Sequence, residues 1–423
     1  MLAATVPIAP PASPPAFVHD SRLMRGSNHT GMRQFNERIV LQAVRHHGAM
    51  AKADLARLTQ LSTQTVSIIV NRLASEGLLV KQARVRGKIG QPSVPMALNP
   101  EGAFSLGLQV GRRSLEVLVS DFLGQPRHRL QFTYPYPDPD RVLSNIQQGL
   151  AQMQALMGDA WRHTVGIGLT APLSLHKWAD LLGGDAAPAL ARWEGIDLLA
   201  AVQALTALPV EFAKDTTAAC MAEMLQGHGR TVANFLYVFV GTFVGGGLVL
   251  AGHIVAGAHG NAGAIGSMPM SLSEANGIHA QSTRPAQLLQ LASGWQLEQA
   301  LEQAGFDAQL VHQECIMDPT YAAMTGPWLE QASRALAMTL TSAAALVELD
   351  AVVIDGTLGR SLIEALTQAT RREVERYNLE GLHVPAVLVG QVGAHARALG
   401  GSLLPLHRQF FPIKDIFLKQ DLV

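Results

Sequence analysis

Three runs of apolar residues near the start of the chain constrain its fold more than any other feature. The runs, each with apolar side chains at helical spacing, span 32–47, 52–59 and 62–76. Gly48 ends the first run, Gly77 ends the third, and Ser62 stands at the N-cap position of the third. Because each run is short and carries a single apolar stripe, the pattern predicts three helices that pack on one another.

The segment that follows predicts a β-hairpin with a basic tip. Residues 78–82 and 94–98 have the composition of paired strands, and the stretch 83–91 between them carries three cations. Three short helices followed by such a hairpin are typical of a winged helix-turn-helix domain, which we expect over residues 32–98. The Pro-rich residues 1–31 contain no long apolar run, and we expect them to form a disordered tail.

Charge divides the chain at about residue 95. The first 95 residues hold 12 Lys and Arg against 4 acids, a net charge of +8, whereas the other 328 hold 20 against 29, a net charge of −9. A basic head on an acidic body is expected when one domain contacts nucleic acid and the other has a different task. We therefore favour binding to double-stranded operator DNA over the alternative, a solvated helical bundle with a charged loop.

The third predicted helix presents short polar side chains opposite its apolar stripe. In a helix-turn-helix domain this side enters the major groove, where such groups hydrogen-bond base edges and phosphates. Cations at the end of the helix and in the hairpin tip are expected to contact phosphates or the minor groove. The expected DNA-binding residues are Ser62, Thr63, Gln64, Ser67, Asn71, Arg72, Arg84, Arg86, Lys88 and Gln91.

Beyond residue 98, short β runs separated by glycine turns alternate with helices. The predicted strands are 104–110, 115–120, 165–169, 209–212, 235–240, 247–251 and 351–354, and the predicted helices are 140–157, 196–207, 216–226, 328–347 and 361–377. This alternation predicts an α/β body over residues 99–423, arranged in two lobes. A length of 423 residues and a hydrophobic content of 48% allow at least two cores of ordinary size.

The cysteines and the hydropathy of the chain indicate a cytoplasmic protein. Cys220 and Cys315 form neither a disulfide framework nor a C-x-x-C pair, so we expect both to be buried free thiols. No segment has the roughly 18 consecutive apolar residues that span a bilayer. We therefore expect no membrane partner.

Short motifs, most of which contain glycine, follow one another through the body in a distinctive order. They are 166–172 (Gly-Ile-Gly-Leu-Thr-Ala-Pro), 208–219, 241–247, 257–266, 352–357 and 393–401. Further short motifs in the head are 33–36, 54–56, 61–62, 76–78 and 90–92. The whole series, over about residues 33–410, resembles the ROK family of sugar kinases and sugar-responsive repressors. The resemblance implies a two-lobed actin-like (ribonuclease-H-like) ATPase or sugar-kinase fold behind a winged helix-turn-helix reader, in whose wing Gln91 replaces the usual arginine.

Relative to that family, the chain departs at the positions that serve ATP. Residues 109–113 are Gln-Val-Gly-Arg-Arg where the family has Asp-x-Gly-Gly-Thr. The acid that organises the metal nucleotide is therefore absent, and two arginines occupy the approach of the phosphates. Phe243 also stands where glycine is usual in the second phosphate loop. We accordingly expect neither an enzyme nor a bound cofactor.

The sugar site implied by the resemblance is also altered. Asp215 matches the family's catalytic base, and we expect it either to bind a ligand hydroxyl or to cap the following helix. Ala264 and Ser267 replace a Glu and a His that hold sugar hydroxyls in the family. The expected ligand-binding residues are Lys214, Asp215, Asn261, Ala264 and Ser267. That His is also a zinc ligand in the family, with cysteines that 268–292 lack; His279 alone remains there, so we expect no metal.

Together these features predict a DNA-binding transcriptional regulator, a repressor, whose kinase-like body senses a carbohydrate-related or other small ligand without phosphorylating it. Because one short recognition helix offers few contacts, we expect a homodimer or homotetramer that presents two heads to a two-fold operator. A ligand in the cleft is expected to change lobe closure, head spacing and therefore operator affinity. Two alternatives stay open, a regulator controlled by a partner protein and an active sugar kinase.

Overall fold

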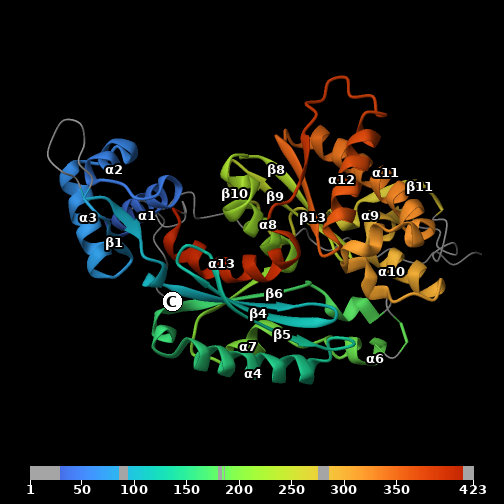
Figure 1. Cartoon of the computed structure of the whole chain (residues 1–423), viewed down its shortest axis with the longest axis horizontal. Coiled ribbons are helices and arrows are strands. Elements are labelled where there is room, and N and C mark those ends of the chain that lie inside the picture. Colours follow the sequence, from blue (N-terminus) through green and yellow to red (C-terminus); the bar gives the residue numbers. More distant parts are fainter. Residues whose placement is uncertain (1–28, 85–93, 180–182, 185, 275–284, 413–423) are drawn as a thin grey trace, which may run out of the picture.

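The computed structural model describes residues 29–84, 94–179, 183–184, 186–274 and 285–412 (Figure 1). A small head of three helices and a hairpin leads into a body with two five-stranded sheets. Helix α13 (Ala396–Phe410) lies between the two lobes of the body and runs toward the head (Figure 1). This helix is the element that connects the three parts.

The head is a winged helix-turn-helix domain. Its elements are α1 (His29–His47), α2 (Lys52–Thr59), α3 (Thr63–Ser75), β1 (Leu79–Lys81) and β2 (Met96–Leu98), and the two strands pair antiparallel. Val40, Leu55 and Val66, one from each helix, are 0% exposed and form the centre of its core. Helix α1 starts at His29, so the helical structure begins before the expected position 32. The rest of the Pro-rich segment lies outside the described residues.

The first lobe of the body carries the sheet order β5-β4-β3-β6-β7. Its strands are β3 (Phe104–Val110), β4 (Ser114–Asp121), β5 (Pro126–Thr133), β6 (Thr164–Ala171) and β7 (Val210–Lys214). Strands β3 to β5 form an antiparallel meander, while β6 is parallel to both β3 and β7. Helix α4 (Pro139–Met157), capped by the Asp138 side chain, covers one face and α13 the other (Figure 1). Two short helices, α6 (Ala186–Ala191) and α7 (Leu198–Gln203), complete this lobe.

The second lobe repeats this arrangement in the order β10-β9-β8-β13-β14. Its strands are β8 (Phe235–Val240), β9 (Val244–Leu250), β10 (His253–Ile254), β13 (Ala351–Gly356) and β14 (Ala386–Val389). Its other elements are α8 (Asp215–Gln226), α9 (Leu288–Ala292), α10 (Gly294–Gln303), α11 (Ala322–Leu346), α12 (Arg360–Val374) and the pair β11 (Pro269–Glu274) and β12 (Pro285–Gln287). An antiparallel meander extended by parallel strands in both lobes confirms the predicted two-lobed α/β fold.

The structure corrects several expected elements. Helix α11 begins at Ala322 and includes Pro327, although the sequence pattern suggested a start after that proline. The helix stays intact because Trp328 is buried and its Nε1 donates to the Ser293 carbonyl at 2.9 Å. Helix α7 is shorter than the predicted 196–207, and β14, α9 and α10 were not predicted. Their short apolar runs have no period long enough to distinguish helix from strand.

Helix α13 packs unusually close to its neighbours because glycines line the contact. A Cβ on Gly168 of β6 would collide with the backbone carbonyl of Gly401, and a Cβ on Gly400 would collide with the carbonyl of Ala218 in α8. The backbones of α13, β6 and α8 therefore touch directly. Such contact leaves little room for α13 to shift without moving both lobes.

The cysteines differ in burial. Cys220 lies in α8 and is fully buried, and burial raises the pKa of its thiol well above the usual range. Cys315 is only partly buried, so the expectation of two buried thiols is wrong for this residue. Among the described residues, no helix is long and apolar enough to cross a membrane.

Candidate functional site

The exposed side of α3 forms one candidate site. The Ser62 hydroxyl caps the helix by accepting a hydrogen bond from the Thr65 N–H at 3.0 Å, as the sequence predicts. Thr63, Gln64 and Asn71 are exposed and Ser67 is partly exposed. These side chains lie on the side of the helix that faces away from the core of the head. The helix therefore offers a row of small polar groups to solvent.

Ile68 is exposed to 63% on the same side of α3. It was not among the expected DNA-binding residues, because only the polar side chains opposite the buried stripe were expected to contact DNA. The helical period carries the missing signal, since positions 64, 68 and 71 are spaced by four and three residues and share a face. An exposed β-branched side chain between Gln64 and Asn71 is suited to apolar contact with the methyl group of thymine.

The basic residues of the head are in different environments. Arg72 bridges Glu37 of α1 at 2.9 Å and Glu76 at 2.7 Å, so it ties α3 to α1 while its side chain stays 40% exposed. Lys52 donates to Asn71 Oδ1 at 2.8 Å. Arg84 is exposed at the base of the hairpin. The other expected wing residues, Arg86, Lys88 and Gln91, lie outside the described residues.

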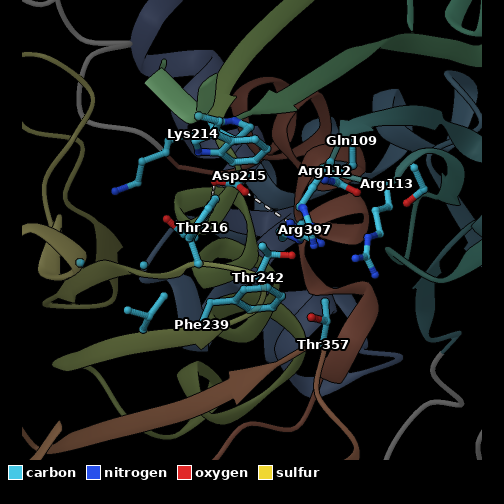
Figure 2. Close-up of a pocket in the computed structure, with 18 of the residues that line it drawn as sticks. Gln109, Arg112, Arg113, Lys214, Asp215, Thr216, Phe239, Thr242, Thr357 and Arg397 are labelled. Atoms are coloured by element: carbon cyan, nitrogen blue, oxygen red, sulfur yellow. Dashed lines mark hydrogen bonds and ion pairs between the residues drawn. The ribbon is translucent and has the colours of Figure 1, made fainter. Parts of the chain in front are cut away.

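A cavity of about 690 Å³ lies between the two lobes of the body and forms the second candidate site (Figure 2). The five residues expected to bind a ligand all line it: Lys214, Asp215, Asn261, Ala264 and Ser267. They come from the β7–α8 junction of one wall and from the segment after β10 on the other. The fold thus brings together residues that are about 50 positions apart in the sequence.

Asp215 is the first residue of α8 and faces the cavity (Figure 2). Its Oδ1 accepts a hydrogen bond from the adjacent Thr216 N–H at 2.8 Å, and its Oδ2 lies 3.5 Å from Arg397 Nη1. Lys214, not Asp215, occupies the N-cap position, and it makes no side-chain capping bond. Asp215 is therefore not the N-cap residue, although its Oδ1 accepts from an N–H of the first turn, and its Oδ2 faces the cavity and Arg397.

The wall beside Asp215 has few acceptor groups. Lys214 Nζ donates to Asn261 Oδ1 at 3.0 Å, and burial lowers the pKa of Lys214. Ala264 offers no polar side-chain atom, and Ser267 offers only a hydroxyl. This wall therefore lacks the paired carboxylate and imidazole that bind two sugar hydroxyls at once.

An ion pair between the lobes lies at the opposite end of the cavity. Arg112, at the β3–β4 turn, places Nη1 2.6 Å from Oε2 of Glu298 in α10, and its guanidinium lies 4.5 Å from the centre of the Trp295 ring. Arg113 shares the same carboxylate at 3.2 Å. Glu298 is 1% exposed, and burial lowers the pKa of Arg112. The sequence predicts the two arginines at this place but gives no sign of Glu298, which lies 186 residues away.

The same end carries a neutral side chain at the position where the kinase pattern has an acid. Gln109, at the position of the expected acid, is 2% exposed and neutral. Phe243 packs its ring 5.3 Å from that of Trp178 beside the β8–β9 turn. In the part of the chain that the structure describes, no three His, Cys, Asp or Glu side chains are grouped to hold a metal ion. His279 lies outside that part.

Helix α13 joins this cavity to the head. Arg397, in its first turn, contacts Asp215 as described and also lies over the Phe239 ring at 5.1 Å. At the other end, the Phe411 ring stacks 4.8 Å from the Arg45 guanidinium, and the Phe411 carbonyl accepts from Arg38 Nη1 at 3.0 Å. Arg38 and Arg45 belong to α1 of the head. A 15-residue helix spans about 22 Å, so one element reaches from the cavity to α1 of the head.

Comparison with known proteins identifies both parts of the chain. The model of the ROK family matches residues 105–408, most of the chain, and that of the MarR family matches residues 34–88. The chain belongs to the ROK family. The MarR match coincides with the winged helix-turn-helix head, so this ROK protein carries a DNA-binding type of domain in front of the family's body.

Relatives of this ROK protein include transcriptional regulators. The xylose repressor of Bacillus subtilis is 25% identical over 248 residues, which are 57% of this chain and 62% of the repressor, so the match spans less than two thirds of that relative. An uncharacterized protein of Sinorhizobium fredii, y4fQ, is 25% identical over 377 residues, covering 89% of this chain and 92% of y4fQ. The crystal structure of a ROK family transcriptional regulator, a homologue of the E. coli Mlc protein, superposes with a TM-score of 0.66 at 21% identity and covers 92% of this chain and 98% of that one. This last comparison shows that the two proteins share a fold.

Proposed function

We propose that this ROK protein is a cytoplasmic DNA-binding transcriptional repressor whose body senses a small, carbohydrate-related ligand without phosphorylating it. One observation supports this function above the others. A winged helix-turn-helix with a solvent-exposed recognition face is fused to a ROK body in which Gln109 replaces the acid needed for metal-nucleotide chemistry. The first feature is suited to binding operator DNA. The second favours a cleft that binds a ligand and does not transfer phosphate to it.

Recognition of the operator falls to α3. The side-chain amides of Gln64 and Asn71 can each form two hydrogen bonds with an adenine in the major groove. Ile68, between them, is suited to contact a thymine methyl group. Ser62 and Thr63, at the start of the helix, are placed to bind phosphate together with the backbone N–H groups there. The wing cations, including Arg84, would add charge next to the groove.

Two heads are needed for an operator of ordinary specificity. A single head with one short recognition helix buries too little DNA surface for tight specific binding. We therefore propose a homodimer or homotetramer on a two-fold symmetric site, with half-sites one helical turn or a multiple of it apart. In this arrangement, the spacing of the heads decides the affinity.

Coupling between ligand and DNA follows from α13. A ligand that contacts Arg397 or Asp215 acts on the first turn of α13, and Phe411 after its last turn is stacked on Arg45 of the head. Since α13 touches both lobes without clearance, a change in lobe closure moves its end and shifts the head. The ligand thus changes operator affinity by favouring one of two arrangements.

Selection of genomic DNA fragments by the purified full-length chain tests this function. Wild type is expected to enrich a two-fold symmetric sequence, and the double variant Gln64→Ala/Asn71→Ala is expected to lose the enrichment. Ser75→Ala, at the exposed end of the same helix, is the matched control and keeps it. Failure of the wild-type chain to enrich any sequence would refute operator recognition.

A further inference from the structure

We propose that the interlobe cavity binds an anionic small molecule, one that carries a carboxylate or phosphate group, and that Arg397 and Lys214 supply its main charge contacts. This inference rests on the proposed ligand-sensing function and names the chemical class of the ligand. Three observations support it: the positive charge of the residues that line the cavity, the incomplete ion pairing of these cations, and buried hydrogen-bond donors that lack acceptors.

Cations are concentrated in the cavity. Of its 33 lining residues, six are Lys or Arg and two are carboxylates. Outside this lining, residues 96–423 are acidic, since they hold 14 Lys or Arg against 27 acids. The cavity is therefore a positive pocket in a negative domain, and such a pocket attracts anions at its own site while the surrounding surface repels them.

The pairing of these cations is incomplete. Arg112 and Arg113 share the single carboxylate of Glu298. Among the described residues, the acceptor of Lys214 Nζ is the neutral amide of Asn261. Lys177 forms no ion pair with any described residue, and its side chain is exposed. Positive charge is thus left over in a confined space, where its interaction with an anion is stronger than in water.

Arg397 is the best placed of the cations. Its Nη1 lies 3.5 Å from Asp215 Oδ2, a long contact for a charge-assisted pair. Its Nε is buried and has no acceptor in the described structure. Its side chain lies between Asp215 and the Phe239 ring (Figure 2). A ligand carboxylate or phosphate in the cavity would pair with the guanidinium and draw it away from Asp215, a movement that would also uncover Nε.

Gln109 supplies a second, independent donor. Its side chain is 2% exposed and lines the cavity, and its Nε2 has no hydrogen-bond acceptor in the described structure. A buried donor without a partner costs roughly 1–3 kcal/mol, so such groups in folded proteins are usually met by a ligand or water. Both unpaired groups, Gln109 Nε2 and Arg397 Nε, are donors. They favour a ligand rich in acceptors over one that must donate.

The opposite wall agrees with this preference. A neutral sugar binds through hydroxyls that donate as well as accept, and the acceptors available here are few. Ala264 offers none, and Asn261 Oδ1 is already bound to Lys214. Of the two carboxylates that line the cavity, Glu116 is paired with Arg129 and His395, so Asp215 is the better placed to accept a hydroxyl hydrogen from the uncharged part of the ligand. An acidic sugar or a sugar phosphate satisfies both walls.

Isothermal titration calorimetry on the full-length chain tests this proposal with four probes: D-glucose, D-glucuronate, D-glucose 6-phosphate and inorganic phosphate. We expect at least one charged probe to bind at least 10-fold more tightly than D-glucose, with its affinity falling as salt rises. Glucuronate and the two phosphates separate carboxylate from phosphate recognition. Arg397→Gln and Lys214→Gln are each expected to lower the affinity for the charged probe at least 10-fold. Arg334→Gln on the outer helix α11 is expected to leave this affinity unchanged.

The proposal is overturned if D-glucose binds as tightly as every charged probe, if no charged probe binds, or if Arg397→Gln and Lys214→Gln both bind the charged probe like wild type. Circular dichroism verifies that each variant is folded. Because Arg397 and Lys214 lie on different elements, the test still stands if one of the two variants fails to fold. Operator binding is measured on the same preparations. Intact operator binding with no anion preference refutes this inference alone, whereas absence of operator binding refutes the proposed function.

Discussion

Arg112 and Glu298 form a buried ion pair that joins the two lobes, with Nη1 and Oε2 2.6 Å apart. The arginine comes from the β3–β4 turn of the first lobe and the glutamate from α10 of the second. In a working kinase of this fold, this turn must admit the phosphates of a nucleotide. Here the side chains that fill the turn fasten the lobes together, so the departure from the kinase pattern has a structural consequence as well as a chemical one.

Loss of Glu298 should destabilise the chain strongly. Glu298→Gln leaves the buried Arg112 without its counter-charge, and breaking a buried pair in this way costs about 3–5 kcal/mol. Chemical denaturation of the purified variant measures the free energy of unfolding. Glu330→Gln is the matched control, because Glu330 pairs with Arg334 at a surface where both side chains are more than half exposed. That change should cost about 0–1 kcal/mol, and equal effects of the two variants would contradict the account.

The close packing of α13 gives a second prediction. Gly400→Ala places a Cβ against the Ala218 carbonyl and should lower the free energy of unfolding by about 1–3 kcal/mol or more, because backbone must move to admit it. Gly326→Ala in α11 meets nothing within 4 Å and should instead stabilise by about 0.5–1 kcal/mol. Thermal unfolding of both variants measures this difference. A tolerated Gly400→Ala would show that α13 is not held tightly against α8.

Stability should depend on pH through His407, which lies in α13 near the head. Burial lowers its pKa to about 4 from an ordinary value of 6.5, with nearby positive charge adding to the effect. The folded state therefore prefers the neutral ring, so the contribution of His407 is full above pH 6.5 and is lost as the pH falls toward 4. The loss amounts to about 3 kcal/mol at full extent.

Urea unfolding at pH 7 and pH 5 measures this dependence. His407→Gln, which cannot take up a proton, should flatten the decline between these pH values, while His163→Gln at an exposed position should leave it as in wild type. An unchanged slope in His407→Gln would mean that other groups cause the decline.

Catalysis gives a fourth prediction. Wild type should transfer no phosphate from ATP to a panel of hexoses and amino sugars in a coupled assay. Gln109→Asp alone should not restore transfer, because the Arg112–Glu298 pair and Phe243 still occupy the phosphate approach. A glucokinase of the ROK family, run in parallel, controls the assay. Turnover above the no-enzyme rate by the wild-type chain would overturn the proposal that it is not an enzyme.

Local patterns predict the head well and long-range contacts poorly. Helix α2 spans Lys52–Thr59 and Ser62 caps α3, both as predicted, because these features depend on neighbouring residues. The five residues that the order of motifs assigns to a ligand site all line one cavity. It does not predict the Arg112–Glu298 pair or the Arg45–Phe411 stacking, whose partners are far apart along the chain. No local period encodes which distant side chain a buried charge will meet.

The most direct test of the central claim is the affinity of the full-length chain for its selected operator. Fluorescence anisotropy at about 0.15 M salt compares this duplex with a scrambled duplex of equal length. We predict binding at least 1000-fold tighter to the operator, reduced at least 10-fold by Ile68→Ala and Gln64→Ala and unchanged by Ser75→Ala. Equal affinity for the two duplexes, or indifference to the α3 variants, would contradict the assignment of this chain as a sequence-specific regulator.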